Sequence, residues 1–582
     1  MRKTLFVLLA ILVGASVVLA SCAPATTPTT PTTPTTPTTP TTPTTPTTPT
    51  APTGPEMVTV SLKKLDGTTI TKTVEKPRYG GTINYAMQAG PVGWDPVTTP
   101  VYANPGIKLN CEQLLIADWA RGPGGTGETT WKLGSLFNPY FERNVLAESW
   151  EITGDKIIVN LRKGVHFQNK PPTNGRELTS DDVIYCLNRV LWTPTAAAFT
   201  KFLDEQRAVT KFSAPDKYTV VIETAPAFAG PTWETFCTQG AIYPRDMLEA
   251  RTTITDWRDM AGSGPFTVED YVPESVITLE RNPNYYGTDP IFPENQIPYV
   301  DTVKFLIIPD VSTRQAGLRT GKIDQLGDTS SGGSGPVSWD EGTIFINSAP
   351  HIKYSTSLNL SSTLIGMRID KPELPFYKLQ VRRALQMAID REAIKKSFYS
   401  DKAEIQAYPI SPLPEFDSVY TPIDKLPESS REQFIYDPAK AKQLLADAGY
   451  PNGFDTEVVC RTVDTDMLSI IKSYWADIGV NLKLDQKSNS VWTSIRGLKT
   501  HTQMMTLDTN TGTPEKLTTT RPGARTNLSI VDDKYLNDSY EQIAASYFDY
   551  PVRDPIMKDL AVYMIDQAWY IAPPQPYVYT LW

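Results

Sequence analysis

Few residues of this chain have the types and spacing that catalysis or metal binding requires. Its cysteines and histidines are spread widely: Cys22, Cys111, Cys186, Cys237, Cys460, His166, His351 and His501. No cysteine pair has CxxC spacing, so a zinc site or a Cys/His catalytic pair would need distant segments to converge. No GxSxG or HExxH motif is present. The sequence therefore predicts no catalytic residue, no metal site, no cofactor and no enzyme activity.

Two short segments resemble chemical sites and are better explained by local structure. Ser330–Gly335 has the glycine content of a phosphate-binding loop, but no Lys-Ser or Lys-Thr pair follows it. We interpret it as a flexible loop. Asp181 and Asp182 directly follow Ser180, and acids in the first turn of a helix complement its dipole. We therefore assign them to a helix start rather than to a pair of catalytic carboxylates.

Cys22 is the one cysteine whose surroundings point to a specific modification. Two basic residues precede an apolar run over residues 5–19, and small residues lead to the cysteine in Leu19–Cys22. This is the pattern of a secretory signal, with the cysteine at the position of a bacterial lipobox. A transmembrane helix is the alternative, but the run is shorter than the roughly 18 apolar residues that a span requires. We predict a lipoprotein signal over residues 1–22, lipid on Cys22, and an extracytoplasmic protein anchored to the cell membrane, periplasmic or at the cell surface.

Residues 23–55 are predicted to form a disordered tether. Of these 33 positions, 18 are threonine and 11 are proline, and none is charged. Proline fixes φ and cannot donate to a helix or sheet ladder. The segment should lie as a solvated polyproline-II strand that reaches up to about 100 Å, at about 3.1 Å per residue. Its threonines resemble those that carry sugar in mucin-like stalks. Composition leaves open whether the tether is a stalk of required length or a passive spacer.

The rest of the chain is long, acidic and without a further apolar stretch that could span a membrane. Residues 56–582 suffice for two or three domains with full cores. Without the two basic residues of the signal, 53 basic residues face 64 acidic ones. This balance argues against nucleic acid or anionic lipid as a partner. Four cysteines remain in this part, which allows zero, one or two disulfides. Cys186 falls on the apolar side of a predicted helix and is expected in the core.

Alternating strand and helix patterns predict an α/β fold with mixed sheets. Gly80–Tyr85 has the pattern of a turn that leads into an opening strand, and residues 155–161 have that of a hairpin strand. Ser180 is the predicted cap of a helix whose apolar residues recur with helical spacing. Further helices are predicted at 381–389, 438–448 and 468–478, with strands at 457–459 and 481–484.

A series of short motifs follows one another along the chain. They are Asp95–Pro96, Leu146–Glu151, Leu161–Phe167, Ser180–Tyr185, Gly262–Phe266, Leu279–Tyr286, Leu318–Asp324, Val381–Leu385 with Ala388–Arg391, and Tyr436–Tyr450. Each motif is weak alone. In this order, from about residue 77 to the end, they resemble the extracellular solute-binding proteins of family 5. That family contains the oligopeptide-, dipeptide- and nickel-binding receptors of ABC importers.

The resemblance implies a two-lobed periplasmic-binding-protein fold of class II, with mixed β-sheets, a hinge and an extra subdomain in the first lobe. A ligand would lie between the lobes and be enclosed as they close. The implied divisions are the opening part of the first lobe over 56–108, an inserted subdomain over 109–240, the first lobe continued over 241–345, the second lobe over 346–572 and a return towards the first lobe over 573–582. The family usually continues beyond an aromatic strand such as Pro576–Tyr579, whereas this chain stops at Trp582. A truncated end is one interpretation of this terminus.

The resemblance also implies a function. We expect a monomeric receptor that captures a peptide and delivers it to the permease subunits of an ABC transporter. A nickel chelate or an oligosaccharide on the same scaffold is the alternative, because a fold does not determine its ligand. A surface hydrolase or an adhesin is a more distant alternative. The missing catalytic motifs weigh against the hydrolase, and the lack of tandem repeats weighs against the adhesin.

Asp508, Thr506 and Met504 are the candidate ligand-binding residues. In peptide-binding members of the family, an aspartate of the second lobe pairs with the ligand's α-ammonium just before a turn, and Asp508 falls at the matching place. Residues 504–508 are predicted to form a short strand that runs into Thr509–Gly512. Backbone groups at Met504 and Thr506 would then pair with an extended peptide. The family's tryptophan just upstream is absent, and the local sequence alone favours an aspartate that only forms a turn, so the family position is what supports the ligand contact.

Overall fold

The computed structural model describes the chain from Pro55 to Trp582 with short gaps. The gaps are 100–103, 132–140, 194–208, 226–227, 249–252, 328–332, 360, 511–516, 518–519, 523 and 525. The predicted signal, Cys22, nearly all of the tether and part of the Ser330–Gly335 loop therefore lie outside the described residues. Residues 57–582 form one compact unit.

The predicted opening strand is the end strand of a four-stranded sheet. Gly80 and Gly81 have φ of 106° and 86°, a left-handed conformation that favours glycine. The sheet has the order β10-β11-β12-β3 and consists of β3 (Thr82–Met87), β10 (Phe266–Val272), β11 (Val276–Arg281) and β12 (Thr302–Ile307). β12 and β3 run parallel, and the other pairs run antiparallel. The sheet is therefore mixed, as predicted.

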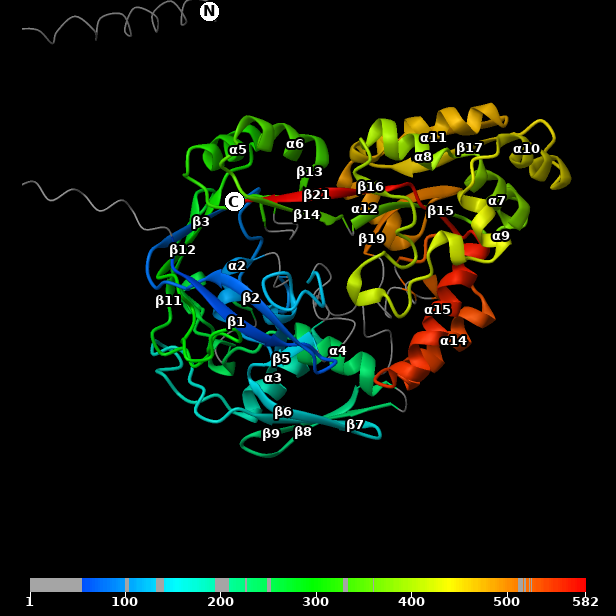
Figure 1. Ribbon diagram of the computed structural model, residues 1–582. Helices are drawn as coiled ribbons and strands as arrows, with labels where there is room; N and C mark the ends of the chain where they lie inside the picture. Colours follow the sequence, from blue (N-terminus) through cyan, green and yellow to red (C-terminus); the bar gives the residue numbers. More distant parts are fainter. Residues whose placement is uncertain are drawn as a thin grey trace, which may run out of the picture. The chain divides into compact units, whose positions relative to one another are not determined.

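The predicted hairpin strand belongs to an antiparallel sheet with the order β6-β7-β9-β8. Its strands are β6 (Ala147–Thr153), β7 (Lys156–Leu161), β8 (Val209–Asp216) and β9 (Thr219–Thr224). Figure 1 shows α3 (Ser180–Trp192) and α4 (Ala229–Gln239) beside this sheet, and both helices contact it. α3 is the helix predicted from the apolar spacing. Its Val183, Leu187 and Val190 are buried.

The start of α3 corrects the predicted cap by one residue. Thr179 is the N-cap, with an extended backbone at φ −132°, and its N–H donates to a carboxylate oxygen of Asp182 at 3.1 Å. Ser180 is the first helical residue, and its hydroxyl donates to the Asp216 carbonyl oxygen at 2.7 Å. Both residues carry a hydroxyl, so only the backbone conformation selects the cap. Asp182 also pairs with Arg176 at 2.6 Å, in keeping with its assignment to the helix start.

The second half of the chain builds a five-stranded sheet with the order β18-β17-β19-β15-β20. Its strands are β15 (Ser361–Met367), β17 (Phe454–Cys460), β18 (Val480–Gln486), β19 (Met504–Asn510) and β20 (Tyr570–Ile571), and the three predicted helices are α7 (Leu379–Met387), α10 (Pro438–Asp447) and α11 (Thr465–Asp477). β17 runs parallel to β18 and β19, whereas β15 runs antiparallel to β19 and β20. The predicted elements are all present, with their ends shifted by a few residues.

The other main elements complete the described part of the chain. They are β1 (Met57–Lys63), β2 (Thr69–Glu75), α2 (Pro105–Asn110), β4 (Leu115–Ala117), β5 (Glu142–Asn144), α5 (Val311–Arg319), α6 (Trp339–Ser348), α8 (Arg391–Ala393), α9 (Glu428–Arg431), α12 (Asn489–Leu498), α14 (Lys534–Ala545) and α15 (Tyr550–Asp566). β1 and β2 pair as an antiparallel hairpin. Among the helices that the structure describes, none has the length and apolarity to cross a membrane.

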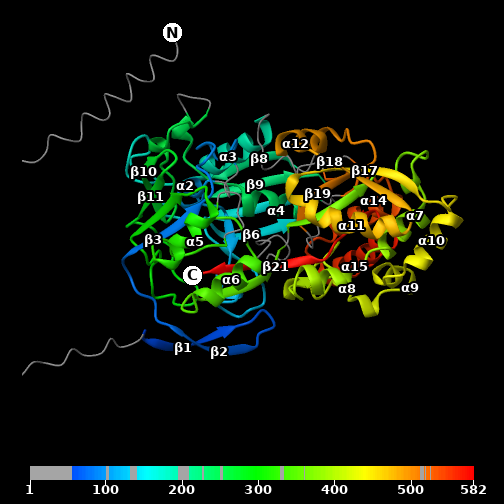
Figure 2. The same ribbon diagram turned by 90° about the horizontal axis from the view of Figure 1, so that it is seen from above.

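The last strand, β21 (Gln575–Leu581), pairs with three short strands. They are β13 (Val337–Ser338), β14 (Tyr354–Leu358) and β16 (Ala403–Glu404). β16 pairs with the first two residues of β21, whereas β13 and β14 pair with its later residues. Figure 2 shows β21 running from the side of β19 towards α6. The strand therefore connects regions that lie far apart in the sequence.

Buried apolar side chains form four clusters, which we call the first to fourth cores. The first core lies within residues 87–303, the second within 358–570, the third within 365–571, and the fourth joins residues 86 and 318–349 to β21. Met504 of β19 belongs to the third core and Met505 to the second. Successive side chains of a strand point to opposite faces, so the second and third cores cover the two faces of the sheet that contains β19.

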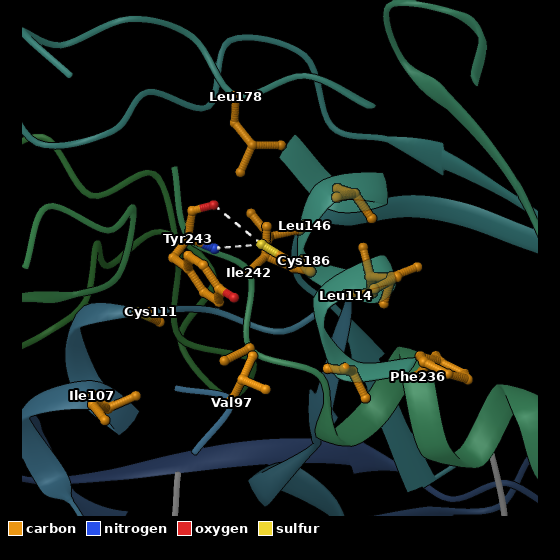
Figure 3. Close-up of a cluster of buried hydrophobic side chains, with 14 of the residues drawn as sticks. Val97, Ile107, Cys111, Leu114, Leu146, Leu178, Cys186, Phe236, Ile242 and Tyr243 are labelled. Carbon is orange, nitrogen blue, oxygen red and sulfur yellow. Dashed lines mark hydrogen bonds between the residues drawn. The ribbon is translucent and has the colours of Figure 1, made fainter. Parts of the chain in front are cut away.

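The four cysteines beyond the signal are buried and free: Cys111, Cys186, Cys237 and Cys460. Figure 3 shows Cys186 in the first core, where its thiol donates to the Tyr243 carbonyl oxygen at 3.2 Å and accepts from the Tyr243 N–H at 3.3 Å. Burial raises the pKa of the Cys186 thiol. Of the alternatives that the sequence left open, the structure has no disulfide among these four, and Cys186 is confirmed as a core residue.

A buried carboxyl group, Glu112, joins separate segments beside the first core. Its Oε1 accepts hydrogen bonds from the hydroxyls of Tyr285 at 2.9 Å and Tyr286 at 3.0 Å, and its Oε2 accepts from Ser263 at 2.7 Å. Burial raises the pKa of Glu112 to about 7, against the lowering effect of the three hydroxyl donors. The group therefore titrates near neutral pH in the folded chain.

We expect this group to make the folded chain less stable at high pH. Its folded pKa lies above its unfolded value, so its contribution to stability is complete below a pH of about 4.5 and is lost as the pH rises through about 7. That shift corresponds to roughly 3 kcal/mol in the free energy of unfolding. Urea denaturation of the wild type and of Glu112→Gln across this range checks the expectation. The exposed Glu148→Gln should keep the wild-type pH dependence, and an unchanged dependence in Glu112→Gln would contradict the assignment.

Candidate functional site

Strand β19 carries all three candidate ligand-binding residues, and its neighbours differ along its length. At Met504 both sides are occupied, because this residue pairs with Met367 of β15 and with Val458 of β17. The pairing with β17 ends at Met505, so among the described residues only β15 is a partner strand for the rest of β19. The edge of β19 on the side of β17 therefore lacks a partner strand from Thr506 onwards, whereas at Met504 it is occupied, and Thr506 and Leu507 are themselves buried. The predicted backbone contact at Met504 is thus blocked by β17.

The side chain of Thr506 is buried and bonded within the protein. Its hydroxyl donates to Oδ2 of Asp464 at 2.9 Å and accepts from Nε1 of Trp492, on α12, at 3.1 Å. These bonds hold the middle of β19 in place. Thr506 is buried as a whole, so a ligand would reach its backbone only if the residues that cover it moved away.

Asp464 joins the strands at this end of the sheet. Its buried carboxylate accepts from the Arg461 backbone N–H at 3.0 Å, from Arg461 Nη2 at 3.0 Å and from the hydroxyl of Thr363 on β15 at 3.3 Å. The Arg461 guanidinium lies 4.5 Å from the centre of the Trp492 ring, a cation–π contact. One carboxylate thus fixes β15, β19 and the turn after β17 relative to one another.

Asp464, Arg461 and Trp492 were not among the site residues predicted from the sequence. A local signal was present, because Arg461 and Asp464 lie between the strand predicted at 457–459 and the helix predicted at 468–478. Ligands of α/β sheets bind beyond the carboxyl ends of strands, so a polar pair at such a place is a candidate. The partners Thr363 and Thr506 lie 101 and 42 residues away from Asp464. No local pattern indicates those contacts.

Asp508 lies on β19, in register with Thr363 of β15. Its side chain lies outside the described residues, so its pairing with a ligand stays a prediction. The structure brings Met504, Thr506 and the Asp508 backbone together on one strand beside Asp464. Cys22, the predicted lipidation residue, lies outside the described part of the chain.

Comparison with known families decides what kind of protein carries this site. The model of the bacterial extracellular solute-binding proteins, family 5 (middle region), matches residues 143–526. The chain belongs to this family. The resemblance found in the sequence motifs is thereby confirmed. The match covers α3, the five-stranded sheet up to β19, and the residues Asp464, Arg461 and Trp492.

Two curated proteins are similar in sequence to this family 5 solute-binding protein. Heme-binding protein A of Haemophilus influenzae is 29% identical over 358 residues, which cover 58% of this chain and 60% of that protein. Di/tripeptide-binding protein 1 of Pseudomonas aeruginosa is 26% identical over 371 residues, which cover 58% of this chain and 62% of that protein. The matched region thus spans less than two thirds of either relative's length.

A solved structure extends the likeness to most of the solute-binding protein. The ABC transporter-associated periplasmic binding protein DppA of Helicobacter pylori, in complex with the peptide STSA, has a TM-score of 0.64 at 21% identity, over 87% of this chain and 94% of that one. At this identity the likeness establishes the fold. The predicted α/β, two-lobed periplasmic-binding-protein fold is confirmed.

We expect Asp464→Asn to destabilise the sheet that contains β19. The change leaves the partly buried Arg461 without its carboxylate and weakens the bond to Thr506, at a cost of about 2–3 kcal/mol in the free energy of unfolding. Urea denaturation followed by tryptophan fluorescence measures this cost. Asp466→Asn, at an exposed position of α11, is the control and should change little. Equal stabilities for the two variants would contradict the anchoring role of Asp464.

Proposed function

We propose that this protein is the extracytoplasmic, lipid-anchored substrate-binding component of an ABC transporter, and that it captures peptides between its two lobes and delivers them to the membrane permease. The observation that carries the proposal is membership of a solute-binding family together with the two-lobed fold. A relative named for di- and tripeptides and a likeness to a structure with the peptide STSA support the ligand class. The role is binding and not turnover.

The lobes that such a receptor needs are assigned as the sequence motifs implied. The first lobe is residues 56–108 and 241–345, with an inserted subdomain over 109–240, and the second lobe is 346–572, before a return over 573–582. The cores support this division, because the first core lies within 87–303 and the second and third lie within 358–571. The pairing of β21 with β13 and β14 supports the return.

The peptide site is assigned to the far end of β19. An extended peptide would pair with backbone groups from Thr506 onwards, where β17 no longer pairs with the strand. Thr506 and Leu507 are buried in this structure, so they would be uncovered only when the lobes open. The Asp508 carboxylate would form an ion pair with the peptide's α-ammonium group. Met504 is paired with strands on both sides, so it would help to position β19 and would not contact the peptide through its backbone. The bonds from Asp464 and Trp492 to Thr506 support a rigid strand. A rigid partner loses less entropy on binding.

A second candidate is the same receptor with a non-peptide ligand. The observation that favours it is the 29% identity to a relative named for heme. A nickel chelate or an oligosaccharide falls into the same class of alternatives. Thermal-shift measurements with short peptides, heme, nickel chelates and oligosaccharides separate the classes. A ligand at 100 times its dissociation constant adds roughly 2.7 kcal/mol to stability. Turnover of a bound compound would contradict the receptor assignment altogether.

Truncating Asp508 should weaken peptide binding strongly. Without the carboxylate, a buried ammonium group lacks its partner, which costs about 3–5 kcal/mol and lowers affinity on the order of 10²–10³-fold or more. Calorimetry with one bound peptide and its N-acetylated form, against the wild type, Asp508→Ala and Asp508→Asn, measures this effect. The acetylated peptide should bind weakly to all three proteins. Unchanged affinity in both variants would remove Asp508 from the site.

Cys22→Ala should abolish the membrane anchor. A lipobox without its cysteine offers no thiol for the diacylglyceryl group, so the variant should stay unprocessed or be shed from the membrane. Membrane fractionation and the intact mass of the mature protein measure the outcome. A variant that stays membrane-bound with an unchanged mature mass would show that Cys22 does not carry the lipid.

A further inference from the structure

The turn between α14 and α15 carries an aromatic side chain from one core region to another. Both helices belong to the second core, through residues such as Ile543 and Met557, but Phe548 packs against the first core. The centroid of its ring lies 5.6 Å from that of Trp233 on α4 and 6.0 Å from that of Trp150 on β6. Aromatic pairs at such distances attract beyond their buried area. The three rings therefore form an apolar contact between the first and second cores.

The turn between α14 and α15 is held by close contacts on two sides, with α4 on one side and with Arg553 of α15 on the other. On the α4 side, a Cβ atom on Gly230 would lie 2.2 Å from the Cβ of Tyr547, so only glycine allows this approach. On the other side, the buried Arg553 donates from Nη1 to the Tyr547 carbonyl oxygen at 2.9 Å, and its guanidinium lies 4.3 Å from the centre of the Tyr550 ring. The second core thus holds the turn rigidly while α4 touches it closely.

A second contact, of different chemistry, links the same two cores. Glu415 is buried and precedes Phe416 of the second core. Its carboxylate accepts from the Thr130 hydroxyl at 2.6 Å and from the Thr130 N–H at 3.2 Å. Thr130 belongs to residues 118–131, which follow β4 of the first-core region and which we call the strap. Two donors on one carboxylate fix the direction of approach as well as the distance.

The strap is braced by the β1–β2 hairpin. Glu128 of the strap accepts from Arg121 Nη1 at 3.1 Å and from the Leu65 backbone N–H at 2.8 Å. Arg121 also donates to the Lys63 carbonyl oxygen at 2.8 Å. Lys63 is the last residue of β1 and Leu65 lies in the turn before β2, so the hairpin supports the strap. These hydrogen bonds between the strap and the hairpin hold the strap, and with it Thr130, in the position that contacts Glu415.

We propose that Phe548 against Trp150 and Trp233, and Thr130 on Glu415, are two parts of one lock that holds the receptor closed. The proposal rests on the proposed function, because it needs lobes that open and close. In Figure 1 α4 and α14 lie below β21, on the side of the β6–β9 sheet, so a rotation at β21 that moves the second core away from the first would separate α4 from α14. If these two contacts form only when the lobes close, as the proposal holds, they favour the closed state and slow ligand release without touching the ligand.

Amide hydrogen exchange at Thr130, in the full chain without added ligand, tests the lock. Gly230→Ala places a methyl group against Tyr547 and should prevent the α14–α15 turn from packing against α4. Exchange at Thr130 should then become on the order of tenfold faster, which corresponds to the loss of one aromatic contact. Phe548→Ala removes the ring without a clash and should act in the same direction. Gly497→Ala is the matched control, since a Cβ there meets nothing within 4 Å.

Reciprocal coupling provides the second arm of the experiment. Glu415→Gln keeps the size of the side chain and removes its charge. The Asp549 N–H, bonded to the Ser546 carbonyl oxygen at 2.8 Å within the turn, should then exchange faster, because coupling between two sites is mutual. Unchanged protection of amides in β15 and β17 shows that each variant is folded.

The outcomes separate the lock from the proposed function. Unchanged exchange at Thr130 in both Gly230→Ala and Phe548→Ala would overturn the lock and leave two unrelated contacts. Faster exchange in both, with the control unchanged, supports it. Addition of trialanine to the wild type is read separately: a lack of response to this and other short peptides weighs against the peptide assignment, and the exchange results of the variants still decide the lock.

Discussion

One strand, β21, belongs to two regions of the protein at once, and the arrangement of the cores depends on it. Tyr577 packs against the second core, whereas Tyr579 and Leu581 belong to the fourth. Backbone pairing on both sides fixes the register, because a slip of one residue would turn Tyr579 and Leu581 out of the fourth core. A two-lobed receptor needs chain crossings that stay folded while the lobes move. β21 provides such a crossing, because it pairs with β16 at its beginning and with β13 and β14 further along.

The candidate site and the proposed lock meet in the second core. Met505 and Leu507 of β19 belong to this core together with Ile543 of α14. Protein interiors are closely packed and transmit displacement, so β19 and the α14–α15 turn should move as one body. A ligand held by β19 would then favour the position in which Phe548 meets α4. Under the proposed lock, closing would be stabilised at a place that the ligand does not touch.

Much of the fold was predictable from the sequence, and most of the site's support was not. The apolar spacing after Ser180 predicted α3, and the motif order predicted the family and the fold. The cap at Thr179 was missed because two adjacent hydroxyl residues differ there only in backbone conformation. The contacts of Asp464 with Thr506 and of Thr130 with Glu415 join distant parts of the chain. Local patterns carry no information about such pairs, since tertiary packing alone brings them together.

Native mass spectrometry of the protein purified without denaturation shows whether it holds a solute between its lobes. A receptor that encloses its ligand between two lobes should retain part of it through purification. We expect a folded species heavier than the polypeptide with its anchor, and a small solute of peptide mass released on denaturation. A released heme or metal chelate would keep the receptor and replace the ligand class. Release of a processed product that accumulates with time would contradict the receptor role, because it would mean that the site performs catalysis.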